Sequence, residues 1–196
     1  MPLSLPICIG PNALDRLVAF VEARDLQRFY LVADGNTWRA LGAKVDRALT
    51  AHDKVVTPII LKGRVITDEE QIMQVLLATE PEERVYLAVG SGTITDIVRF
   101  VSHRTSRPFV SLPTAPSVDA YASMNAPLIV RRLKQTVQAQ MPMAIFADLE
   151  TLCQAPPAMI AAGFGDMLAK YTCLVDWQLG HLLWGERHDA QIARDA

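Results

Sequence analysis

Cysteine and surplus charge of either sign are scarce in this sequence. Its three cysteines, Cys8, Cys153 and Cys173, lie far apart and outside any C-x-x-C spacing, so they predict buried packing thiols in a reducing compartment and no disulfide framework. The formal net charge is −2, and the basic residues form no long run. The protein therefore lacks the positive charge that would attract it to a phosphate backbone, and we expect no nucleic-acid partner.

Targeting and membrane segments are also missing from the pattern. Residues 1–10 carry no positive charge and too short an apolar stretch for a signal peptide. No later stretch approaches the roughly 18 consecutive apolar residues of a membrane span. We expect a cytoplasmic protein without a membrane span.

Apolar residues, by contrast, are plentiful enough for a sizeable core. The chain has 196 residues, of which 51% are hydrophobic and 20% charged. Burial on that scale can offset the loss of conformational entropy on folding. The length suits one domain, or one domain with a piece of another.

Short apolar runs rich in β-branched residues alternate with helical patterns in the first three quarters of the chain. The predicted strands are 29–33, 55–61, 85–89, 109–112 and 144–147, and the predicted helices are 12–23, 37–49, 68–77 and 93–103. Several strands are apolar on both faces, which indicates a parallel sheet covered by helices. The predicted fold class is α/β, a Rossmann-like doubly wound parallel sheet. Asn36 and the 67–70 stretch mark helix starts.

The pattern changes after Glu150. Pro156 and Pro157 can open a helix, and the stretch to about Trp184 is apolar at helical spacing. We predict a dinucleotide-binding domain over 1–154 and the first helices of a helical domain over 155–196. Two or three helices leave apolar faces without partners, so we expect a truncated chain that forms homo-oligomers.

A glycine-rich turn lies between a predicted strand and a predicted helix. The turn comprises Gly90, Ser91, Gly92 and Thr93, whose backbone N–H groups and helix N-terminus can hold a pyrophosphate. The third glycine of the full G-x-G-x-x-G pattern is replaced by Thr95. A plain glycine-rich turn is the alternative interpretation.

Two further acids are candidates for cofactor binding. Asp34 ends a strand, where a carboxylate can accept hydrogen bonds from an adenosine ribose and repel a 2′-phosphate, favouring NAD over NADP. An Asx turn explains Asp34 equally well. Asp96 follows the glycine-rich turn, although an acid in the first helical turn is also explained by the helix dipole.

Residues 111–123 leave a strand end with many small polar groups and one carboxylate, Asp119. Loops at the carboxyl edge of a parallel sheet line ligand sites, and a proline-stiffened surface loop is the alternative. Further along, Asp166 lies among small and apolar residues, where a carboxylate needs a cation or a donor. Its alternative is a helix N-cap.

Taken in order, residues 90–96, 113–119, 147–150 and 162–166 resemble the sn-glycerol-1-phosphate dehydrogenases, particularly the bacterial kind. The resemblance covers nearly the whole chain. That family is similar to iron-type alcohol dehydrogenases, glycerol dehydrogenases and dehydroquinate synthases, which pair a Rossmann-like domain with a helical domain around a divalent metal. One departure is Ala120, where a glycine is usual.

The resemblance implies a role for each candidate residue. By it, the glycine-rich turn cradles the pyrophosphate of NAD or NADP, Asp34 binds the ribose, and Thr114 and Ser117 lie along the cofactor. Asp119 and Ser123 approach the nicotinamide and substrate, and Asp166 binds the metal, which is zinc, nickel or iron.

The implied reaction is the NAD(P)-linked interconversion of sn-glycerol 1-phosphate and dihydroxyacetone phosphate. The family's two histidine ligands lie beyond this chain, and His181, 15 residues after Asp166, would be roughly 22 Å away along a helix. Neither His181 nor His188 is then a co-ligand, and we expect the chain alone to be inactive. Alternatives are a polyol dehydrogenase, a dehydroquinate synthase-like lyase, or a nucleotide-binding fragment. Arg131, Arg132 and Lys134, interpreted as residues of a strand pair, are candidates for the substrate's phosphate or solvated side chains.

Overall fold

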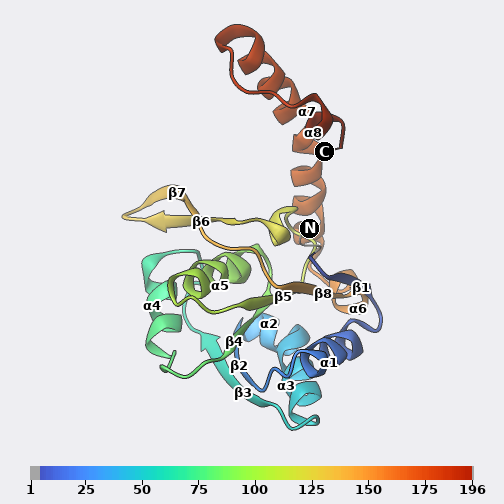
Figure 1. The fold of residues 1–196 in the computed structure, drawn as a ribbon, viewed down its shortest axis with the longest axis vertical. Coiled ribbons are helices and arrows are strands. Elements are labelled where there is room, and N and C mark those ends of the chain that lie inside the picture. The colour runs from blue at the N-terminus through green and yellow to red at the C-terminus, as the bar shows by residue number, and fades with distance from the viewer. Residues whose placement is uncertain (1–4, 196) are drawn as a thin grey trace.

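A parallel six-stranded sheet with helices on both faces forms the body of the molecule (Figure 1). The computed structural model describes residues 5–195. The strands lie in the order β1-β8-β5-β4-β2-β3, and every neighbouring pair is parallel. Their bounds are β1 Ile7–Gly10, β2 Arg28–Asp34, β3 Val55–Leu61, β4 Val85–Gly90, β5 Phe109–Pro113 and β8 Ala144–Asp148. The predicted doubly wound α/β fold is confirmed.

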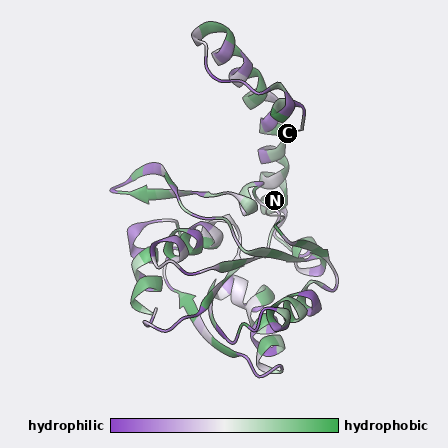
Figure 2. Cartoon of the chain, viewed as in Figure 1, coloured by the Kyte–Doolittle hydropathy of each residue, from purple (hydrophilic) through white to green (hydrophobic). Residues whose placement is uncertain are grey.

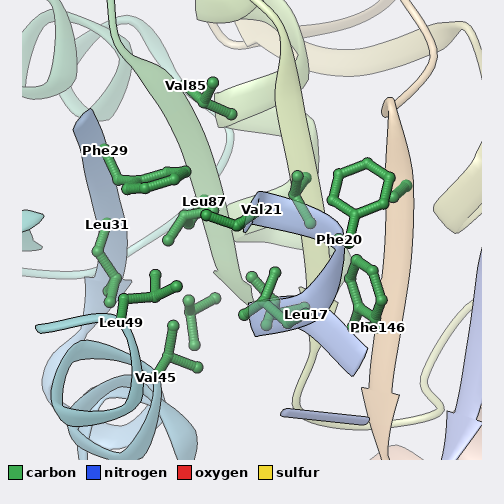
Figure 3. Close-up of a cluster of buried hydrophobic side chains, with 14 of the residues drawn as sticks. Leu17, Phe20, Val21, Phe29, Leu31, Val45, Leu49, Val85, Leu87 and Phe146 are labelled. Atoms are coloured by element: carbon green, nitrogen blue, oxygen red, sulfur yellow. The ribbon is translucent and has the colours of Figure 1, made fainter. Parts of the chain in front are cut away.

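Alternating side chains of strand β2 enter two separate cores. Phe29 and Leu31 pack into one cluster, and Tyr30 and Val32 pack into the other. This division follows from the period of two along a strand. Figure 3 shows the first cluster, where side chains of α1 and α3 meet those of β2, β4 and β8. Each fully buried large apolar side chain contributes about 1.5–3 kcal/mol to folding.

The helices of the body follow the strands in alternation. Their bounds are α1 Ala13–Ala23, α2 Gly35–Thr37, α3 Ala43–Thr50, α4 Glu69–Leu77, α5 Gly92–Arg104 and α6 Leu149–Cys153. Side chains of α1 and α3 contribute to one core, whereas those of α4 and α5 contribute to the other. The sheet is therefore covered on both faces, as its apolar strands require.

The strand order reverses between β2 and β4. From β2 the chain crosses to β3 on one side, and it then returns to β4 on the other side. In an open parallel sheet, ligands bind outside the carboxyl ends of the strands at such a point. Asp34 and Gly90 end the two strands that flank it.

One strand was not predicted, whereas a strand pair is present where Arg131, Arg132 and Lys134 were interpreted as part of one. The edge strand β1 was not predicted, because four residues with half of their side chains exposed carry little pattern. An antiparallel hairpin, β6 Asn125–Val130 and β7 Leu133–Gln138, projects from the body. Its turn is made by Arg131 and Arg132, both with positive φ.

The predicted helix 37–49 is not one regular helix. It divides into α2, a π-helical turn at Trp38–Gly42, and α3. A Cβ on Gly42 would come within 2.8 Å of Trp38 Cε3, so the turn depends on the glycine. The predicted helix start at Asn36 is wrong, because the side chain of Asp34 caps the helix two residues earlier.

Beyond the body, α7 (Pro157–Trp184) extends away from the sheet and α8 (Ala190–Asp195) turns back along it (Figure 1). Pro157 opens α7, as predicted, and Gly185 ends it with a left-handed φ of 68°. The predicted boundary at 154/155 falls between α6 and α7. Only Gly163 and Gly180 of α7 are buried among the described residues, and Figure 2 shows hydrophobic (green) segments interspersed with hydrophilic (purple) ones along this protruding helix.

By length and composition, α7 meets the requirement for a membrane span, with a mean hydropathy of 1.2 over its most apolar window. A single such helix is weak evidence for a membrane. The stretch is not a continuous apolar run, because Asp166, Lys170 and Asp176 interrupt it.

Not all cysteines are packing thiols. Cys8 is half-buried against the first core, as predicted, but Cys153 and Cys173 are exposed. The prediction of burial fails for these two because Cys153 is in the last turn of α6 and Cys173 is on the uncovered helix α7.

Candidate functional site

The N-terminus of α5 lies at the carboxyl edge of the sheet and has no side-chain cap. Three other helices are capped by an aspartate, namely α2 by Asp34, α4 by Asp68 and α6 by Asp148. At α5 the cap position is Ser91, and its side chain makes no capping hydrogen bond. The first-turn N–H groups of α5 have no partner within the helix, so they can bind an anion.

Two pockets open on either side of Ser91. Pocket A, of about 290 Å³, lies toward β2, and Asp34, Thr37 and Thr114 contribute to its lining. Pocket B, of about 400 Å³, lies toward the hairpin. Its lining includes Gly92 and the polar residues Thr67, Ser91, Thr93, Asp96, Ser117 and Lys134. Ser91 and Met159 line both pockets, so a ligand longer than either pocket can pass from one to the other across the N-terminus of α5.

The two glycines of the turn have different roles. A Cβ on Gly90 would overlap the side chain of Ile94, so this glycine lets α5 pack closely on the end of β4. A Cβ on Gly92 would lie 3.1 Å from Val118 Cγ2, where the residue lines pocket B. Gly90 therefore serves packing, and Gly92 keeps the pocket open.

Asp34 is engaged with the backbone. One carboxylate oxygen accepts hydrogen bonds from Asn36 N at 2.7 Å and Thr37 N at 2.9 Å, and Thr37 Oγ1 accepts one from Asp34 N. The turn-forming interpretation of Asp34 is thus observed. Asp34 also lines pocket A, so the cap and the pocket involve the same side chain.

Asp96 forms a buried ion pair with Arg99, one turn along α5. Burial raises the pKa of Asp96 to about 6, despite the opposing effects of Arg99 and Lys134. The same burial lowers the pKa of Arg99. Pocket B therefore has a carboxyl group that titrates near neutral pH beside the helix N-terminus.

Arg99 holds the loop that follows β5. Its guanidinium is fully buried and donates to the carbonyl oxygens of Ala120 at 2.8 Å, Tyr121 at 3.0 Å and Asn125 at 3.1 Å. Charge-assisted bonds to three carbonyls fix this part of the chain relative to α5. Ser123, in the same segment, accepts a hydrogen bond from Asn125 N at 2.9 Å and lines neither pocket.

The loop also meets α7. A Cβ on Gly163 would overlap the carbonyl oxygen of Pro116, so the helix and loop backbones touch. Asp119 N donates to Asp166 Oδ2 at 2.9 Å, and Lys170 Nζ forms an ion pair with Asp119 Oδ2. We call Asp119, Asp166 and Lys170 the junction. The predicted donor for Asp166 exists, and its alternative as an N-cap is wrong because the residue is inside α7.

The junction does not form a complete metal site. Among residues 5–195, no group of three His, Cys, Asp or Glu side chains could hold a metal ion. His181 is on the same continuous helix as Asp166, and its Nδ1 contacts Glu186 O at 2.6 Å. Asp166 supplies one carboxylate, whereas a catalytic zinc site needs about three protein ligands.

The structure gathers most of the predicted site residues into neighbouring places. Pocket A contains Asp34, Ser91 and Thr114. Pocket B contains Ser91, Gly92, Thr93, Asp96 and Ser117, and the junction contains Asp119 and Asp166. Gly90 and Ser123 line neither pocket.

Sequence reasoning missed Arg99 and Lys170. The i,i+3 spacing from Asp96 to Arg99 and the i,i+4 spacing from Asp166 to Lys170 are the signals that could have found them. For Lys134, the sequence left two interpretations open: a ligand of the substrate's phosphate, or a solvated side chain. It is exposed and lines pocket B.

The sequence of the chain was compared with those of known proteins. Residues 8–156 match the model of iron-containing alcohol dehydrogenases. The chain is 46% identical over 184 residues to a glycerol-1-phosphate dehydrogenase [NAD(P)+] of Geobacillus thermodenitrificans, covering 92% of this chain and 46% of the relative. It is 42% identical over 197 residues to the enzyme of that name from Bacillus subtilis, covering 97% and 50%. The chain therefore spans about half the length of these relatives.

Among solved structures, glycerol dehydrogenase from Schizosaccharomyces pombe has a TM-score of 0.76 and 22% sequence identity. The match covers 85% of this chain and 43% of that one. At that identity the likeness concerns the fold alone.

Proposed function

The chain belongs to the iron-containing alcohol dehydrogenase family, and we propose that it contributes to an NAD(P)-linked oxidoreductase that interconverts sn-glycerol 1-phosphate and dihydroxyacetone phosphate. The names of its relatives support this substrate. The observation on which the proposal chiefly rests is the uncapped N-terminus of α5, with a pocket on either side, at the reversal of strand order. This arrangement suits a dinucleotide with its pyrophosphate at the helix end.

The pockets and the turn fit a nicotinamide dinucleotide. Ser91, Gly92 and Thr93 would hold the pyrophosphate through backbone N–H groups. Asp34 and Thr114 would face the adenosine side in pocket A, and Asp96 and Ser117 would line the other side in pocket B. The bound nicotinamide would take hydride from the secondary alcohol of the substrate or return it to the ketone.

The rest of the chain's contribution is positioning. Arg99 would hold the loop bearing Asp119 and Ser123 at a fixed place beside α5. Asp119 would orient a substrate hydroxyl, and Asp166 would supply one metal ligand from α7. The described residues do not complete a metal site. We therefore expect residues outside 5–195 to supply the other ligands, and this chain by itself to show no turnover with added zinc, nickel or iron.

Asp34 would favour NAD over NADP, because its carboxylate would repel a 2′-phosphate. We also propose a cytoplasmic location, in keeping with the metabolic role of the relatives, and self-association through the uncovered helix α7. The division into a cofactor domain over 1–154 and a helical part over 155–196 belongs to the same proposal.

Calorimetric titration of the chain with NAD and NADP tests the cofactor assignment. We expect weak binding of NAD and weaker binding of NADP. The variant Gly92→Val should bind neither detectably while keeping its circular dichroism spectrum, because the side chain would fill pocket B beside Val118.

Gly165→Ala is the matched control for that titration. An added Cβ there meets nothing within 4 Å, and the residue is remote from the turn on α7, so binding should be unchanged. Unaltered cofactor affinity in Gly92→Val, or absence of binding by the unmodified chain, would remove the proposed role of the turn.

A further inference from the structure

A lysine is placed at the junction, where the proposed substrate and metal residues meet. Lys170 is four residues after Asp166, so both side chains lie on one face of α7, one turn apart. Its ammonium pairs with the carboxylate of Asp119, whose backbone N–H is bound by Asp166. Two carboxylates and one ammonium thus share this end of the loop.

No other cation is paired with either carboxylate among the described residues. The basic residues of the hairpin form no recorded ion pair with Asp119 or Asp166. Of these residues, Lys134 lines pocket B beside the N-terminus of α5. A ligand that binds at Asp119 would therefore lie next to the ammonium group of Lys170.

The ion pair of Lys170 can be exchanged for another anion. Its side chain is 43% exposed, and an ion pair at that exposure contributes little to stability. The hydrogen bond and charge of Asp119 raise the pKa of Lys170, so the side chain stays an ammonium at neutral pH. A lysine on a flexible stem is a common point-charge ligand of phosphate.

We propose that Lys170 binds the phosphate group of the substrate and makes phosphorylated polyols preferred over unphosphorylated ones. This inference rests on the proposed function and specifies which residue reads the phosphate. A three-carbon polyol phosphate has its phosphate only a few bonds from the hydroxyls that Asp119 and the Asp166 metal site would hold. The lysine is placed to change partners from Asp119 to that phosphate.

A second role for Lys170 would be structural, as a clasp between the loop and α7. The two roles predict different results. Loss of a phosphate ligand weakens binding of a polyol phosphate and leaves that of the bare polyol unchanged, whereas loss of a clasp disturbs Asp119 and weakens both.

The experiment compares binding of sn-glycerol 1-phosphate and glycerol to the protein in the presence of NADH, by ligand-observed nuclear magnetic resonance. In Lys170→Met, we expect the affinity for glycerol 1-phosphate to fall by about 10–100-fold, since a hydrogen bond to a charged group is lost. Glycerol affinity should not change. Lys170→Arg, which keeps the charge, should retain most of the preference for the phosphorylated ligand.

Arg132→Met is the matched control, because it removes one positive charge from the hairpin turn, away from the junction. Equal weakening of both ligands in Lys170→Met would overturn the proposal, and so would loss of the preference in Arg132→Met instead. If the unmodified protein binds NAD(P) but prefers neither polyol, the assignment of Lys170 fails while the cofactor site stands. If it binds no NAD(P), the proposed function fails first.

Discussion

Large apolar side chains are buried in the body of the molecule but exposed on helix α7. Leu17 in α1 is fully buried beneath the sheet, whereas Leu182 in α7 is 70% exposed. In the body, strands and helices cover each other on two faces. In α7, the large apolar residues that are exposed include Phe164, Tyr171, Val175, Leu182 and Trp184.

An apolar composition is therefore enough to form a helix but not to bury it. A helix that is apolar on most sides is typical of an interior position, with neighbours all round. Among the glycines of α7, Gly163 is the one at which an added Cβ would overlap the backbone of another segment. Its two ends are set locally by Pro157 and Gly185, so the helix needs little tertiary support to begin and end where it does.

Removing the buried charge of the body should have the largest effect. Arg99→Met would leave the carboxyl of Asp96 without its partner and free three loop carbonyls. We expect a loss of about 3–5 kcal/mol in the free energy of unfolding, measured by urea denaturation. Arg104→Met, on the same helix but exposed, should cost under about 1 kcal/mol. Similar losses in both variants would contradict the anchoring role of Arg99.

A pair of leucine truncations compares the two regions directly. Leu17→Ala should lower the free energy of unfolding by about 2–5 kcal/mol because it leaves a cavity in the core. Leu182→Ala should change it by less than about 0.5 kcal/mol. A large effect of Leu182→Ala in dilute solution would show that α7 is covered there, and a dependence on protein concentration would identify self-association as the cover.

The body should also lose stability as the pH rises through the titration of Asp96. The pKa of this carboxyl is raised from 3.8 to about 6 by burial, so the folded state favours the protonated form. The resulting stabilisation is complete below about pH 3.8 and is lost as the pH passes 6, with a size on the order of 2–3 kcal/mol.

Asp96→Asn provides the test of that pH dependence, because an amide does not ionise in this range. Urea denaturation between pH 4 and 7 should show a flatter profile for the variant than for the unmodified protein. Identical slopes would mean that Asp96 keeps its ordinary pKa in the folded protein.

The smallest effects should come from two glycines of α7. Gly163→Ala places a Cβ on the Pro116 carbonyl and should displace α7 from the loop, at a cost of about 1–3 kcal/mol. Gly165→Ala meets open space and should stabilise the helix by up to about 1 kcal/mol. Amide hydrogen exchange along α7 measures both, with faster exchange expected in the first variant and slower in the second. Equal protection of the α7 amides from exchange in the two variants would show that the contact at Gly163 does not hold α7 on the loop.

Much of the fold and of the site was predictable because it depends on local pattern. The apolar runs identify strands β2 to β5 and β8. The turn at Gly90 and Gly92 and the acids Asp34 and Asp96 lie where a strand ends or a helix begins. The edge strand β1 and the exposure of Cys153 and Cys173 were not predictable, since both depend on which neighbours are present.

The local amino-acid pattern was enough to predict the parallel sheet, the order of its helices and the glycine turn, because side-chain period and the conformational freedom of glycine act over a few residues. The burial of Arg99 against the loop and the pairing of Lys170 with Asp119 depend instead on tertiary packing. Those contacts join residues about 20 to 50 positions apart. Such long-range pairings arise from the packing of α5 and α7 on the loop, which no local pattern encodes.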